Sequence, residues 1–161
     1  MIRKFALAVL ATATISAATL AVAQAPPTPT APPVLKLSLG DLMTALVQPR
    51  HIKLALAGKA RNWDYAAFGL HELEETFEMI EQYVPRYRNA AMPDLMKMIE
   101  APMKTVEAAI KAKDGAAFDA AFAKLTDACN ACHVTTEHKA IVIRVPATSP
   151  FPNQVFEPQR P

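Results

Sequence analysis

Two cysteines and a histidine close together constrain this chain more than any other feature. They form the run Cys129-Asn130-Ala131-Cys132-His133, and the chain has no other cysteine. Residues three apart lie on one face of a helix, so both thiols would face the same side, with the imidazole directly after them. The C-x-x-C-H spacing is typical of covalently attached haem, where two thioethers hold the porphyrin and the histidine binds iron. The alternatives are a disulfide, a chance match, or a thioredoxin-like redox pair, which would need a βαβ context that is not found here.

The N-terminal segment predicts export. Residues 1–23 have the pattern of a cleavable signal peptide, with Arg3 and Lys4 before an apolar run and an A-x-A cleavage site at its end. A retained membrane anchor is the weaker alternative, because the apolar run is short and rich in alanine. Residues 24–37 are rich in proline and predict a disordered tether. Haem c is attached outside the cytoplasmic membrane, so the signal and the C-x-x-C-H motif together predict a periplasmic protein.

The rest of the chain predicts an all-α fold. Glycine is scarce and alanine abundant, which favours helices. Apolar residues at helical spacing predict four helices, over residues 38–57, over 62–84, after Pro93, and from a cap at Asp114 through the motif. Because the connections are short, we expect an antiparallel four-helix bundle.

This bundle would form a haem domain over residues 38–137, followed by an extended C-terminal tail over residues 138–161. Prolines exclude further helix in the tail, and Phe151 and Phe156 are its expected anchors on the bundle.

Single residues predict further details of the helices. Pro49 should kink or locally break the first helix, and Pro102 should kink the third. Gly58 should end the first helix, as glycine often does. The apolar residues of the second helix fall at helical spacing and are expected in the core: Phe68, Leu73, Phe77, Ile80 and Val84. Five glutamates crowd the rest of that helix and predict a solvated face, with a docking surface for a basic partner as the alternative: Glu72, Glu74, Glu75, Glu78 and Glu81.

The sixth coordination position of the iron has two candidate ligands. If the first and last helices are antiparallel neighbours and Ala57 is level with Gly115, then Cys129 is level with about Met43. Met43 is therefore the candidate distal ligand, and its thioether would give a six-coordinate, low-spin haem. His51 is the alternative distal ligand, although it lies about two turns deeper. An open or water-bound position is the third alternative, and the methionines of the third helix are expected to be core residues.

The run Asp127-Ala128-Cys129-Asn130-Ala131-Cys132-His133 resembles the end of the last helix in the cytochrome c-prime-like family of exported haem proteins. Residues 38–156 also resemble a group of small exported monohaem c-type cytochromes of proteobacteria, in Arg50-His51-Ile52-Lys53-Leu54, Ala57-Gly58, Asn62-Trp63 and the tail. The resemblance implies one covalently bound haem c at one end of the bundle, with its distal side facing the first helix. Its members include low-spin electron carriers and high-spin proteins that bind gases such as nitric oxide. The tail after His133 is longer than in typical c-prime cytochromes.

Together these features predict a periplasmic monohaem c-type cytochrome that exchanges electrons with redox partner proteins in the periplasm. The alternative is a five-coordinate protein that binds nitric oxide or carbon monoxide. An enzyme would need a polar acid–base pair beside the haem, for which Arg50 and His51 are the only candidates, so we do not expect an enzyme. Removing Arg3 and Lys4 from the 17 basic residues leaves 15 against 15 acidic ones, which argues against nucleic-acid binding. The oligomeric state stays open between a monomer and a homodimer.

Overall fold

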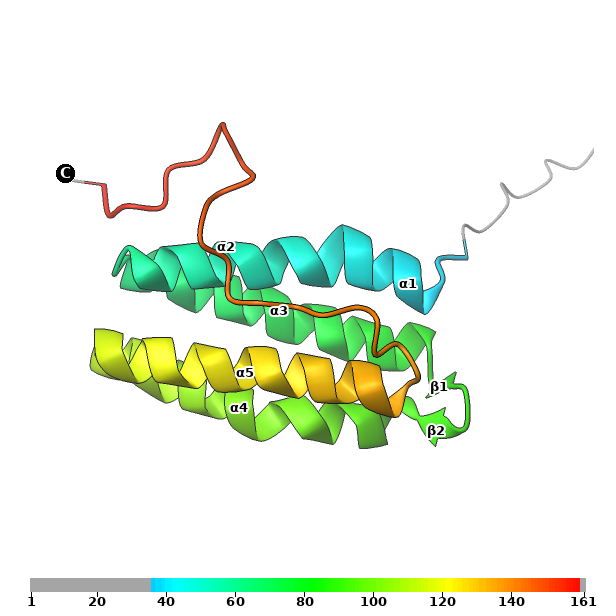
Figure 1. The fold of residues 1–161 in the computed structure, drawn as a ribbon. Helices are drawn as coiled ribbons and strands as arrows, with labels where there is room; N and C mark the ends of the chain where they lie inside the picture. The colour runs from blue at the N-terminus through cyan, green and yellow to red at the C-terminus, as the bar shows by residue number, and fades with distance from the viewer. Residues whose placement is uncertain (1–35, 160–161) are drawn as a thin grey trace, which may run out of the picture. The chain divides into compact units, whose positions relative to one another are not determined.

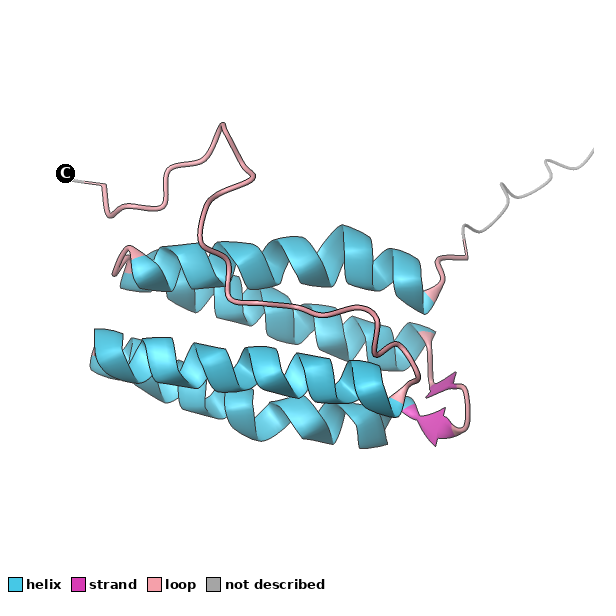
Figure 2. Ribbon diagram, in the orientation of Figure 1, coloured by secondary structure: helices cyan, strands magenta, loops and turns pink. Residues whose placement is uncertain are grey.

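The structure is a computed structural model that describes residues 36–159. The predicted signal peptide (1–23) and residues 24–35 of the predicted tether lie outside the described residues. Within residues 36–159 the protein is mostly helical, and its only strands there are two short ones that pair with each other. The expected all-α class is therefore confirmed for this part of the chain (Figure 2).

The helices lie side by side, with the chain reversing direction at each connection (Figure 1). The first helical segment consists of α1, a π-helical turn η1 and α2, which follow one another without a break. The bounds are α1 Leu39–Leu42, η1 Met43–Val47, α2 Gln48–Lys59, α3 Trp63–Tyr83, α4 Met92–Ala112 and α5 Gly115–Thr135. Strands β1 (Arg86–Tyr87) and β2 (Ala90–Ala91) form an antiparallel pair between α3 and α4.

Helix α2 contacts α3 and α5, and α4 contacts both α3 and α5. Their packed faces form one hydrophobic core, in which Phe118, Phe122 and Leu125 of α5 are almost completely buried. The predicted core residues Leu73, Phe77 and Ile80 of α3 are also buried. The prediction for Phe68 is wrong, since its side chain is 57% exposed.

Polar caps explain where three of the helical segments begin. Ser38 and Asp41 form a capping box at α1, in which the Ser38 hydroxyl accepts from the Asp41 N–H. The Asn62 side chain accepts from the N–H of Tyr65 at α3, and the Asp114 carboxylate accepts from the backbone at the start of α5. These are the starts that the sequence predicts for the first, second and fourth helices.

Proline distorts the first helical segment without interrupting it. Pro49 has no N–H and its ring clashes with the carbonyl four residues earlier in an ordinary helix. The π-helical turn lies directly before it, and the Gln48 N–H there donates to the Met43 carbonyl, five residues back. This wider turn accommodates Pro49, and the helical segment is not broken there. Helix α4 continues through Pro102.

Gly58 has a different role from the predicted one. It lies inside α2, which ends one residue later, and the left-handed residue after the helix is Arg61, with a φ of 60°. A Cβ atom on Gly58 would lie 2.0 Å from the ring of Phe118. The glycine therefore allows α2 and α5 to approach closely, and it does not terminate the helix.

The C-terminal tail, residues 138–159 in the described part, contains no helix or strand, and its first stretch lies along the helices (Figure 1). Phe156 is buried and its ring stacks on Tyr65, with 5.5 Å between the ring centroids. Phe151 is half-buried, with the Lys53 ammonium 5.0 Å from its ring centroid. Both predicted aromatic anchors therefore contact the helices. Within residues 36–159, none of the helices has the length and apolar character needed to span a membrane.

Candidate functional site

A cavity of about 480 Å³ lies where α5 ends and the first helical segment begins. Its walls come from the first helical segment, the start of α4, the end of α5 and the tail. Cys129, Cys132 and His133 all line it. Most of the other lining side chains are apolar, among them Leu39, Val47, Ile52, Phe77, Leu95 and Ile99. We call this space the large cavity.

The two cysteines lie one turn apart on α5 and are not joined in a disulfide. Burial raises the pKa of Cys129 to about 11, with a smaller contribution from the neighbouring Cys132, whose own pKa burial also raises. Both groups are therefore thiols at neutral pH. Reactive thioredoxin-type cysteines have the opposite property, a lowered pKa. The site therefore does not have the electrostatics of a redox dithiol.

His133 is oriented by a hydrogen bond to the tail. Its Nδ1 lies 2.8 Å from the carbonyl oxygen of Ile141. A carbonyl can only accept, so Nδ1 carries the proton and donates it. The lone pair is then on Nε2, which is the arrangement usual for a histidine that binds a metal.

Three methionines line the large cavity. Met43 is half-buried at the start of the π-helical turn, and it shares the cavity with Cys129, as expected from the register between the first and last helices. Met92 and Met96 of α4 are buried core residues, as predicted, but they also line the cavity. Their helical spacing alone could not show this, because it depends on the start of α4 lying beside the end of α5.

His51 also lines the large cavity, but its ring is bonded to α5. Its side chain is only 4% exposed, and Nε2 lies 3.0 Å from the hydroxyl oxygen of Thr126. That hydroxyl donates to the Phe122 carbonyl, so His51 Nε2 is the donor to Thr126. Burial lowers the pKa of His51 to about 4, which keeps the ring neutral. To bind a metal through Nε2, His51 would have to break this hydrogen bond.

Polar groups line another part of the large cavity. The Tyr87 hydroxyl donates to His138 Nε2 over 3.2 Å, while His138 Nδ1 donates to the Thr136 carbonyl over 2.7 Å. Arg144 of the tail is exposed and also lines the cavity. Tyr87 and Arg144 gave no signal in the sequence, because loops far apart in the chain bring them to the site.

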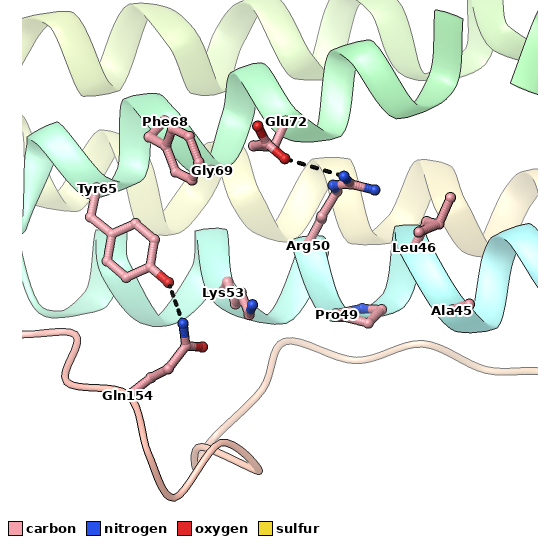
Figure 3. Close-up of a pocket in the computed structure, with 10 residues that line it drawn as sticks. All are labelled: Ala45, Leu46, Pro49, Arg50, Lys53, Tyr65, Phe68, Gly69, Glu72 and Gln154. Carbon is pink, nitrogen blue, oxygen red and sulfur yellow. Dashed lines mark hydrogen bonds and ion pairs between the residues drawn. The ribbon is translucent and has the colours of Figure 1, made fainter. Parts of the chain in front are cut away.

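A second, smaller cavity of about 310 Å³ lies between α2, α3 and the tail (Figure 3). Arg50 lines it and pairs with Glu72 over 3.2 Å, while Gln154 Nε2 donates to the Tyr65 hydroxyl over 3.3 Å. The residues that line it include none from the C-x-x-C-H motif. Arg50 and His51, the only candidates for an acid–base pair, thus line different cavities.

Within residues 36–159, no group of three or more histidine, cysteine, aspartate or glutamate side chains could hold a metal ion by itself. Comparison with known proteins found no matching family model, no similar curated protein and no similar solved structure.

Proposed function

We propose that this chain is an exported monohaem c-type cytochrome, with an antiparallel four-helix bundle of the cytochrome c-prime-like kind, that transfers electrons. One observation carries the proposal: both thiols and the imidazole of the C-x-x-C-H motif line a single, largely apolar cavity. Its volume of about 480 Å³ lies within the range of about 300–1,000 Å³ that is usual for cofactor sites.

The residues of the large cavity fit one haem c. Cys129 and Cys132 would form the two thioethers, and His133 Nε2 would bind the iron. Arg144 is the guanidinium that lines the cavity, and it would face the propionate carboxylates. A bound haem c supplies one-electron chemistry between ferric and ferrous iron.

The protein would control this chemistry through its own side chains. Apolar residues such as Val47 and Ile52 exclude water from the cavity and lower its dielectric constant. The Ile141 carbonyl fixes the proton of His133 on Nδ1. Met43 is the proposed sixth ligand, because it lines the cavity while the Nε2 of His51 is bonded to Thr126. We assign no enzymatic activity, since Arg50 and His51 line different cavities.

Gas binding is the second candidate function. Met43 shares its wall with Leu39, Val47 and Ile52, and a haem with an apolar distal side and no thioether ligand would be five-coordinate. Nitric oxide or carbon monoxide could then bind the iron. Both candidate functions include the predicted periplasmic location. Electron transfer additionally requires redox partner proteins in the periplasm.

The full chain should be produced in cells able to attach haem c. We expect a mass that includes one haem, a pyridine haemochrome typical of two thioethers, a low-spin reduced spectrum and little carbon monoxide binding. A colourless product with the mass of the peptide alone would refute the proposal. A high-spin spectrum with ready carbon monoxide binding would favour the gas-binding function.

A Met43→Ala variant tests the sixth ligand. We expect it to be high-spin and to bind carbon monoxide, because the thioether would be lost. Met98→Ala is the matched control, since Met98 is half-buried on α4 and does not line the large cavity. An unchanged low-spin spectrum in the Met43 variant would exclude Met43 as the ligand.

A further inference from the structure

Asn130, which lies between the two cysteines of the motif, binds the tail through both ends of its amide. Its Nδ2 donates to the Ile143 carbonyl over 2.8 Å, and its Oδ1 accepts from the Ile143 N–H over 2.7 Å. Two reciprocal hydrogen bonds fix both the position and the direction of the tail at this residue. The x positions of a C-x-x-C-H motif have no role in haem attachment itself, so this pairing indicates a separate role for Asn130.

The same stretch of tail also binds His133, through the Ile141 carbonyl at 2.8 Å. Asn130 and His133 are three residues apart on α5 and therefore share a face of the helix. Ile141 and Ile143 are two residues apart in extended chain, so their backbone polar groups point to the same side. The tail thus faces α5 with two residues that match the spacing of Asn130 and His133.

Few other bonds hold this stretch of the tail. It forms no strand within the described residues, and the Ile141 N–H donates to the His138 carbonyl instead of to a helix. The aromatic anchors, Phe151 and Phe156, lie further along the chain. Asn130 is therefore the polar side chain that holds the Ile141 carbonyl in register with the imidazole.

We propose that Asn130 is a positioning residue for the iron ligand: it clamps the tail so that the Ile141 carbonyl accepts the Nδ1 proton of His133. This inference rests on the proposed function. A hydrogen bond from Nδ1 makes the imidazole a stronger electron donor through Nε2, which stabilises ferric iron. The clamp therefore lowers the reduction potential of the bound haem, and the residue inside the motif tunes it through the backbone of the tail.

The test compares the haem-loaded chain with its Asn130→Ala variant, and with Asn153→Ala as the control. Asn153 is an exposed tail residue whose side chain forms no hydrogen bond within the described residues. We expect the Asn130 variant to keep its covalent haem and to show a more positive reduction potential. Amide hydrogen exchange at Ile143 should rise about tenfold, since two hydrogen bonds are lost. The His133 ring N–H should also exchange faster, and the control should change none of these three properties.

An unchanged reduction potential in the haem-loaded Asn130 variant would overturn the inference, whether or not the tail has been released. If that variant does not fold, hydrogen exchange is measured on the unaltered protein instead. An Ile143 amide that exchanges as fast as the exposed Arg144 amide would then overturn the inference. Neither result affects the proposed function. Absence of covalent haem from the unaltered protein would refute the function itself, so the two failures are distinguishable.

Discussion

The interface between α2 and α5 is closed at one end and hollow at the other. At the closed end, Gly58 lies directly against the ring of Phe118, which also contacts the rings of Trp63 and Phe122. At the hollow end, the same two helical segments line a cavity of about 480 Å³ together with α4 and the tail. Because Gly58 has no side chain, α2 and α5 approach closely at the closed end. At the other end, the apolar side chains leave a space whose wall contains both thiols.

His51 and Thr126 lie at the boundary between these ends. Their hydrogen bond joins the two helices one turn before Cys129. The ring of His51 also packs against Phe122, with 4.6 Å between the centroids. The large cavity is therefore not a result of loose packing, because α2 and α5 pack tightly up to the edge of the cavity.

The largest expected effect is at the hollow end. A Cys129→Ala, Cys132→Ala double variant should lose the proposed covalent haem completely, because both thioether sulfurs are gone. Its free energy of unfolding should fall by more than about 3 kcal/mol, the scale expected when a tightly bound ligand is lost. Mass spectrometry and thermal unfolding measure both changes. Retention of haem at full stoichiometry and stability would remove the hollow end as the haem site.

The second-largest effect should be the loss of stability in acid, caused by His51 at the boundary between the two ends. The pKa of His51 is lowered by burial from 6.5 to about 4, so the unfolded chain binds its proton first as the pH falls. The contribution of the neutral His51 to the free energy of unfolding is therefore fully present above pH 6.5. It falls by about 3 kcal/mol as the pH drops to about 4. His51→Gln should flatten the stability profile between these values in urea unfolding. His71→Gln, at an exposed position, is the control, and an equally steep profile in the His51 variant would contradict the prediction.

A methyl group should disturb the closed end by a smaller amount. Gly58→Ala places a Cβ atom 2.0 Å from the Phe118 ring, which has little room to withdraw because it is itself buried and packed against the rings of Trp63 and Phe122. Overpacking should outweigh the gain in helix propensity and destabilise the protein by about 1–2 kcal/mol. Gly40→Ala is the control, because its nearest contact is 3.7 Å away, and it should be neutral or stabilising. Chemical denaturation measures both variants, and equal stabilities would show that the closed end tolerates expansion.

The smallest effect concerns the ion pair beside the closed end. Arg61 contacts the Asp119 carboxylate at 2.7 and 3.2 Å, but both side chains are more than a third exposed. Solvent screening limits such a pair to less than about 1 kcal/mol. Asp119→Asn should therefore lower stability slightly, and less so at high salt. Asp127→Asn on the same helix serves as the control, and a loss above about 3 kcal/mol, the scale of breaking a buried ion pair, would mean that the closed end depends on charge.

The sequence predicted the local features of the fold well. The caps Ser38, Asn62 and Asp114 mark helix starts, because a short polar side chain satisfies free backbone N–H groups wherever the chain enters a helix. Phe118, Phe122 and Leu125 fall at helical spacing, as expected of one buried face, and all three lie in the core. The prediction from spacing failed at Phe68, because periodicity shows which residues share a face of a helix but does not show where the covered face ends.

The candidate site was predicted only in part, for the same reason. Cys129, Cys132 and His133 are adjacent in the chain, so the motif alone placed them together, and antiparallel counting brought Met43 to the same cavity. Nothing in the sequence indicated that Gly58 serves packing against a ring on another helix. Nothing in it indicated that the Ile141 carbonyl would accept from His133.

The helices, their capped starts and the grouping of Cys129, Cys132 and His133 followed from the chain alone, because each depends on residues within a few turns of one another. Tertiary structure alone decided that Met92, Met96, Tyr87 and Arg144 line the same cavity and that His51 is bonded to Thr126. It also decided that the tail reaches the imidazole through Asn130. These contacts join segments far apart in the chain, and their distances depend on how closely the helices pack.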